Sequence, residues 1–65
     1  MKLQLNGASV DVRVTTLEEL LVAEGLGDAK VATAVNGTFV PASARAEHTL
    51  DAGDVIEILA PKQGG

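Results

Sequence analysis

The chain ends in Gly64-Gly65, and the carboxylate of its last residue is the group best suited to covalent chemistry. Two glycines place no Cβ beside that carboxylate, so such an end can enter a narrow active site. A free α-carboxyl group, with a pKa of about 3.5, is an anion at neutral pH and a poor electrophile. It becomes an acyl donor, or accepts sulfur, only after activation, for which adenylation by ATP is the obvious route. We therefore expect Gly65 to be the reactive residue and a partner to supply the activating machinery.

This end is expected to lie on a flexible tail, residues 61–65, that follows a single domain, residues 1–60. The six residues from Ala60 to Gly65, if extended, reach roughly 20 Å, enough to place Gly65 deep inside another protein. The residues expected to thread into partner active sites are Lys62, Gln63 and Gly64. The alternative is that the glycine pair is an incidental end that carries no chemistry.

The side chains offer few candidates for catalysis. The sequence has no cysteine, so it cannot hold sulfur as a side-chain persulfide or use a thiol nucleophile. His48 is the single histidine and is expected to be solvated, and one histidine with scattered acids does not make a zinc site. No glycine-rich loop carries the lysine that a phosphate-binding loop needs. We predict that the chain is not an enzyme, holds no metal and has no cofactor.

Composition limits the setting and the partners. The net charge of −4 and the five scattered basic residues argue against nucleic-acid binding, which needs clustered Lys and Arg. No stretch approaches the roughly 20 apolar residues of a membrane span, and the start of the chain lacks the apolar run of a signal peptide. We expect a soluble, cytoplasmic protein with no membrane or nucleic-acid partner.

The elements that must position the tail begin with a hairpin and a helix. Residues 1–5 and 10–14 alternate apolar and polar side chains, which predicts two half-buried strands joined around the Asn6-Gly7 turn. Thr16 and Glu19 have the spacing of a capping box, so a helix is predicted to begin there. The apolar stripe of that helix consists of Leu17, Leu20 and Leu21.

The second half of the chain predicts three more strands. Residues 31–35 read as an interior strand, and Asn36-Gly37 joins it to a short strand at residues 38–40. Residues 42–49 are predicted to form a one-turn helix or an irregular loop, and Asp51 and Asp54 to form a turn rather than a calcium site. Residues 55–60 read as the last strand. Ile56 and Ile58 share one of its faces, while Val55, Glu57 and Leu59 share the other.

This order of elements predicts an α+β fold: a mixed sheet of four to five strands with one main helix packed on one face. The first and last strands can lie side by side in parallel, because the crossover between them contains the helix. That architecture is the β-grasp, or ubiquitin-like, fold.

Three stretches together resemble a known family. The sequence AVNGTFVP at residues 34–41, the sequence GDVIEI at residues 53–58 and the final Gly64-Gly65 are similar to the ThiS sulfur carriers of thiamin biosynthesis. The match covers essentially the whole chain in length and element order. Departures are Arg45, where members often carry a tryptophan, and Lys62 with Gln63, where an apolar residue often precedes the glycines.

The resemblance implies a β-grasp protein that carries sulfur stoichiometrically. An E1-like enzyme of the ThiF type would adenylate Gly65 with Mg-ATP. A persulfide sulfur donor would then displace AMP to leave a C-terminal thiocarboxylate. A thiazole synthase of the ThiG type would take up that sulfur as the thiamin thiazole ring forms.

The partners are expected to dock on the sheet face away from the helix, near Phe39 and Leu59. Other interpretations are a sulfur carrier for another pathway (molybdopterin, cysteine or a secondary metabolite), a ubiquitin-like modifier conjugated through Gly65, and a β-grasp binding module without carboxyl-terminal chemistry.

Overall fold

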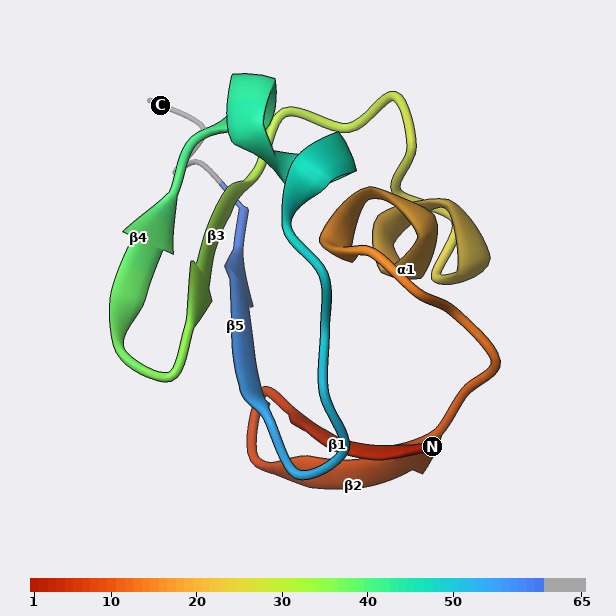
Figure 1. Ribbon diagram of the computed structural model, residues 1–65. Helices are drawn as coiled ribbons and strands as arrows, with labels where there is room; N and C mark the ends of the chain where they lie inside the picture. Colours follow the sequence, from red (N-terminus) through yellow and green to blue (C-terminus); the bar gives the residue numbers. More distant parts are fainter. Residues whose placement is uncertain (61–65) are drawn as a thin grey trace.

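The computed structural model describes residues 1–60, which form a five-stranded sheet with one α-helix on one face (Figure 1). In chain order the elements are β1 (Lys2–Leu5), β2 (Ala8–Asp11), α1 (Leu17–Ala23), β3 (Ala32–Val35), β4 (Thr38–Val40), the 3₁₀-helix η1 (Ala42–Glu47) and β5 (Val55–Leu59). The strands lie in the order β2-β1-β5-β3-β4. The predicted α+β fold of the β-grasp type is confirmed, and the sheet has five strands.

Strand β5 is the centre of the sheet, although it follows the other four strands in the sequence. It pairs in parallel with β1, where Leu5 lies opposite Ile56. It pairs antiparallel with β3, where Val35 also lies opposite Ile56. The predicted parallel contact of the first and last strands is therefore confirmed, and so is the interior position of β3, which lies between β5 and β4.

The hairpin of β1 and β2 differs from the sequence prediction. Asn6 and Gly7, with φ angles of 48° and 85°, form a two-residue turn of the kind that suits the twist of a hairpin. The residue after such a turn joins the ladder at once, so Ala8 lies directly opposite Leu5. The predicted second strand over residues 10–14 was therefore wrong at both ends, because β2 begins at Ala8 and ends at Asp11, opposite the first residue of β1.

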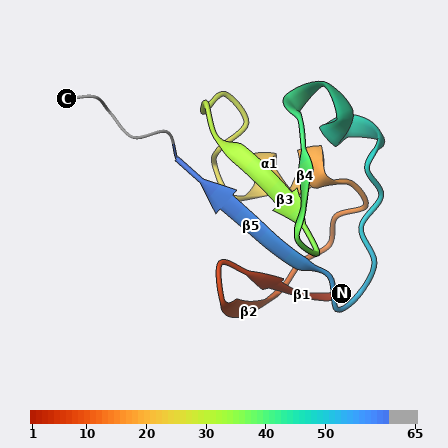
Figure 2. The same ribbon diagram turned by 90° about the vertical axis from the view of Figure 1, so that its left-hand side faces the viewer.

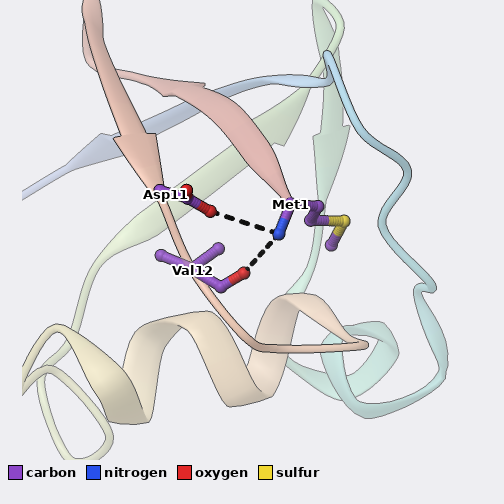
Figure 3. A network of polar contacts seen from close by, with 3 residues as sticks. All are labelled: Met1, Asp11 and Val12. Atoms are coloured by element: carbon purple, nitrogen blue, oxygen red, sulfur yellow. Dashed lines mark hydrogen bonds and ion pairs between the residues drawn. The ribbon is translucent and has the colours of Figure 1, made fainter.

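The open end of this hairpin is closed by the first residue of the sequence (Figure 3). The α-amino group of Met1 donates a hydrogen bond of 2.7 Å to the carbonyl of Val12 and lies 3.3 Å from Oδ1 of Asp11. The amide of Val12 donates back to the carbonyl of Met1 at 2.9 Å. Because Asp11 is exposed, the ion pair contributes little, and the backbone bonds extend the ladder beyond β2.

Helix α1 begins at the predicted capping box. The amide of Glu19 donates to Oγ1 of Thr16 at 3.2 Å, while Oε1 of Glu19 accepts from the amide of Thr16 at 3.2 Å. The same oxygen accepts from the amide of Thr15 at 2.6 Å. Seven residues are too few for a helix to be stable alone, so α1 depends on its packing against the sheet.

The core lies between α1 and the inner face of the sheet. Its buried apolar residues are Leu3, Leu17, Leu20, Leu21, Val35, Val40, Leu50, Ile56 and Ile58. Burying such a side chain fully stabilises the fold by roughly 1.5–3 kcal/mol. In a chain of 65 residues without cysteine, this aliphatic cluster supplies most of the stabilisation.

Candidate functional site

The sheet has an outer face that is turned away from α1 (Figure 2). Large apolar side chains on this face are exposed, and nothing in the described chain covers them. We call this surface the open face; its residues are Ala32, Ala34, Phe39, Val55, Glu57 and Leu59. The largest are Phe39 and Leu59, which are 64% and 65% exposed. Alternation along each strand produces this arrangement, because neighbouring residues point to opposite faces.

The register of the strands brings the two predicted docking residues onto this one face. Phe39 on β4 lies opposite Ala34 on β3, which in turn lies opposite Glu57 on β5. Leu59 lies opposite Ala32, two positions further along the same ladder. Phe39 and Leu59 are therefore separated on the open face by the small side chains of Ala32 and Ala34 on β3.

The predicted reactive end lies outside the described residues. Gly65 and the threading residues Lys62, Gln63 and Gly64 all belong to the stretch after residue 60, as does the predicted tail 61–65. The structure does describe the point from which that stretch departs. It is the carboxyl end of β5, the central strand, with Leu59 and Ala60 as its last residues.

A cleft of about 530 Å³ opens beside this departure point. Its lining residues are 29–32, Ala42, Arg45, Leu59 and Ala60. The cleft is bounded by the segment that enters β3, by η1 and by the end of β5, so it joins three parts of the chain that are distant in sequence. We call it the Arg45 cleft.

The sequence marked Arg45 only as a departure from the family pattern, and sequence reasoning missed its structural role in this region. Arg45 lies in η1, a six-residue 3₁₀-helix in a stretch predicted to be a one-turn helix or an irregular loop, and its side chain is buried. Its Nε donates to Oγ1 of Thr33 at 3.0 Å and its Nη2 donates to the carbonyl of Val31 at 2.5 Å. The Thr33 hydroxyl in turn donates a hydrogen bond of 2.7 Å to the carbonyl of Val40. Two unusual positions in the sequence could have indicated this contact: Arg45 within an alanine-rich stretch, and Thr33 as the single polar residue of an apolar strand.

Two asparagines hydrogen-bond to β5 from opposite sides. The sequence indicated only that these asparagines form turns. Nδ2 of Asn6 donates to the carbonyl of Ile58 at 3.1 Å, and the amide of Ile58 donates to Oδ1 of Asn6 at 2.8 Å. Across the strand, the amide of Val55 donates to Oδ1 of Asn36 at 2.9 Å. Each side-chain amide extends the backbone ladder, Asn36 at the start of β5 and Asn6 near its end, so the Asn6 bonds help to fix the direction in which β5 leaves the sheet.

The loop before β5 is fixed by Asp54. Its carboxylate accepts from the amide of Asp51 at 2.9 Å and from Nδ2 of Asn36 at 3.0 Å. These hydrogen bonds favour the charged form, so the backbone bond, then the Asn36 bond, and lastly the nearby His48 lower the pKa of Asp54 below its ordinary 3.8. The predicted turn role of Asp51 and Asp54 fits this geometry. Within residues 1–60, no three His, Asp or Glu side chains gather as a metal site would require.

His48 takes part in the fold through its backbone. Its amide donates to the carbonyl of Arg45 at 3.2 Å, and its carbonyl accepts from the amide of Leu17 at 2.9 Å. It therefore joins the end of η1 to the start of α1. None of the helices in the described part of the chain has the length and apolar character needed to cross a membrane.

Comparison with known proteins bears on the whole chain. The sequence pattern of the ThiS family matches residues 3–65. The crystal structure of the thiamine biosynthesis protein (ThiS) from Geobacter metallireducens is similar with a TM-score of 0.85 at 30% identity, covering 100% of both chains. The NMR solution structure of a thiamine biosynthesis protein from Geobacter metallireducens gives 0.79 at 29% identity, covering 100% of this chain and 88% of the other. A comparison with curated proteins gives no match.

The sequence match and the structural match agree in extent. The family pattern runs from the first strand through the final glycines, and the similar crystal structure is covered from end to end. The β-grasp fold, the mixed sheet and the single main helix are those expected from the resemblance. This chain belongs to the ThiS family.

Proposed function

We propose that this chain is a sulfur carrier whose C-terminal glycine, Gly65, is converted to a thiocarboxylate that supplies sulfur for the thiazole ring of thiamin. The observation that carries the proposal is the family match, which extends over residues 3–65 and so includes both glycines. Membership in the ThiS family supports a small carrier of thiamine biosynthesis rather than a catalyst. The described side chains fit this assignment, because the open face and the cleft lie at the root of the tail.

The proposed chemistry takes place on the terminal carboxyl group. A carboxylate oxygen of Gly65 attacks the α-phosphorus of ATP on an E1-like enzyme of the ThiF type, and pyrophosphate leaves. The terminal sulfur of a persulfide donor then attacks the carbonyl carbon, and AMP leaves with the electrons of the broken C–O bond. A second thiolate then attacks the donor's own sulfur and forms a disulfide with it, and the thiocarboxylate on Gly65 leaves with the electrons of the broken S–S bond. A thiazole synthase of the ThiG type then takes up this sulfur.

We further propose that the open face is where these enzymes dock. A partner that covers Phe39 and Leu59 buries apolar surface that now faces water, and it stands beside the end of β5. Apolar side chains that are buried at the centre of an interface supply much of its binding energy. Threading of Lys62, Gln63 and Gly64 then brings Gly65 to the enzyme's reactive groups.

Intact-mass spectrometry of the protein recovered from its own cells tests the proposal. Replacement of one oxygen by sulfur raises the mass by about 16 Da, and this species should disappear when Gly65 is deleted. The matched genetic test is thiamin-dependent growth of a strain that has no other carrier. Growth without thiamin after deletion of Gly65 would overturn the proposal. High-mass conjugates in place of the 16 Da gain would instead identify a protein modifier.

A further inference from the structure

We propose that the Arg45 cleft binds a carboxylate on an aliphatic stem, namely a glutamate or aspartate side chain of the partner that takes the tail. The inference rests on the proposed function in one respect, that a partner docks at the end of β5. It assigns to this cleft a recognition role that the family's chemistry at Gly65 does not require. Four features of the described residues support it.

The first feature is the orientation of the Arg45 guanidinium. Its two hydrogen bonds within the protein use Nε and Nη2, the side edge of the planar group. No acceptor among residues 1–60 bonds to Nη1, and no buried polar side-chain atom there lacks a partner, so Nη1 reaches the surface. The end edge formed by Nη1 and Nη2 is thus left for a ligand. That edge has the spacing to bind both oxygens of a carboxylate.

The second feature is the rigidity of the guanidinium. Arg45 is 7% exposed, and it is held by Thr33 on β3 and by the carbonyl of Val31 at the entrance to that strand. An arginine fixed in this way loses little further rotamer freedom when a ligand binds. The free N–H donors of the Arg45 guanidinium are therefore held in a fixed position before a ligand binds, as donors are in well-ordered anion-binding sites.

The third feature is charge. Among residues 1–60, the cleft is lined by two basic residues, Lys30 and Arg45, and by no acidic residue, although the chain as a whole has a net charge of −4. The one ion pair among the described residues joins Met1 to Asp11, so Arg45 has no carboxylate partner within them. A buried cation without a counter-charge is costly, and a carboxylate from another molecule relieves that cost.

The fourth feature is the shape and chemistry of the walls. Apart from Lys30 and Arg45, the lining residues in the described part of the chain are all alanine, valine or leucine. An aliphatic stem can pack against these apolar walls, whereas a fully hydrated ion such as phosphate would place its water shell against them. Leu59 and Ala32 belong to both the cleft and the open face, so a partner that covers the sheet can insert the acidic side chain from the same surface.

A small probe tests the cleft without any enzyme. 4-Methylpentanoate carries a carboxylate on a branched aliphatic stem, and its neutral amide, 4-methylpentanamide, is the matched control. We expect NMR shifts at the Arg45 Nε–H and the Leu59 methyl groups on titration with the acid, with an affinity that is roughly millimolar. The amide should produce shifts at least several-fold weaker, because it cannot pair with the cation.

Two variants locate the binding. Arg45→Lys keeps the charge and loses the planar fork, and it should weaken the acid severalfold. Ala42→Leu keeps Arg45 and narrows the cleft, so it should also weaken binding of the acid. This second variant tests the cleft even if Arg45→Lys does not fold. Arg13→Gln, which removes an exposed cation outside the cleft, should leave probe binding unchanged.

Several results would overturn the assignment. One is equal binding of acid and amide, or shifts confined to Lys30. Another is a free chain whose terminal glycines already show NOE contacts to the cleft methyl groups, because its own tail would then be the occupant. Shifts at these residues that depend on dilution would assign the cleft to a second copy.

The enzyme-level test separates this inference from the proposed function. With a ThiF-type adenylating enzyme, Ala42→Leu or Arg45→Lys should raise the carrier concentration that gives half-maximal ATP–pyrophosphate exchange by roughly tenfold, with the maximal rate unchanged. No exchange with the unaltered chain would refute the proposed function. Normal exchange with every variant would refute only the cleft.

Discussion

The two faces of β5 differ sharply, although they belong to the same five residues. Ile56 and Ile58 point toward α1 and are buried, whereas Val55 and Leu59 point away and are 44% and 65% exposed. Both sets are aliphatic, so composition alone does not tell them apart. One set is covered by the fold, and the other lies on the open face.

This difference separates the residues that hold the fold from those available to a partner. Burial on the α1 side provides the stabilisation of a small domain, since that is where the apolar surface leaves water. Apolar surface on the other side contributes little to folding, and a contiguous patch of it marks an interaction site. Substitutions on the two faces should therefore affect different measurements.

The largest expected effect is on the buried face. Ile56→Ala removes a fully buried side chain at the meeting point of β1, β5 and β3, and should lower the free energy of unfolding by about 2–5 kcal/mol. Because so small a domain has only about 5 kcal/mol of stability, the variant should be partly unfolded at 25 °C. Urea unfolding followed by circular dichroism measures this. A loss below about 1 kcal/mol would contradict the division between the faces.

The next effect concerns the asparagines that flank β5. Asn6→Gly keeps the positive φ of the turn at no steric cost and removes both side-chain bonds to Ile58, so it should cost about 1–2 kcal/mol. Asn36→Gly is the matched variant on the opposite side. Its bonds are exposed to solvent, so its cost should be smaller. Equal losses in urea unfolding would show that burial does not distinguish the two contacts.

The third effect depends on pH. The pKa of Asp54 is lower in the folded chain than in the unfolded one, so its carboxylate contributes stability above the ordinary pKa of 3.8. That contribution is lost as the pH falls through the folded pKa. Solvent screens this carboxylate, because its hydrogen bonds are exposed, so Asp54→Ala should cost only roughly 0.5–1 kcal/mol at pH 7, and the difference from the parent chain should shrink below pH 4. Thermal unfolding at pH 7 and pH 3 provides the check, and a constant difference would contradict this account.

The smallest effect on stability is expected on the open face. Leu59→Ala should change the free energy of unfolding by no more than about 0.5 kcal/mol, because the side chain is largely in water already. The same substitution, or Phe39→Ala, should weaken binding to the adenylating enzyme by roughly tenfold. Titration calorimetry with that enzyme measures the second effect. Unchanged affinity in both variants would remove the open face as the docking surface.

Much of the fold could be predicted from the sequence because its signals are local. Alternation identified the faces of β5, and the Asn-Gly pairs identified both turns, because positive φ is a property of a few adjacent residues. The capping box of α1 was found in the same way. The extent of β2 was not, because the alternation continues to Val14, whereas the ladder with the first strand ends where Val12 pairs with Met1, the first residue of the sequence.

The parts of the site that could not be predicted depend on contacts between distant segments. The bonds from Asn6 to Ile58 span 52 residues, and those from Arg45 to Thr33 span 12. Nothing in the local sequence shows that a turn residue lies beside a strand so far along the chain. The reactive end itself was predicted from residue type, and Gly65 stays a prediction outside the described residues.

The central position of β5 also has a consequence for synthesis. The hairpins β1–β2 and β3–β4 each join neighbours in sequence, but they contact one another only through β5. A nascent chain therefore holds two separate hairpins and an uncovered α1 until residue 59 has left the ribosome. Folding should then complete in one late, cooperative step, since the long-range pairings form last. A ribosome-bound chain that stops before β5 should accordingly be open to proteases, whereas one extended past it should resist them.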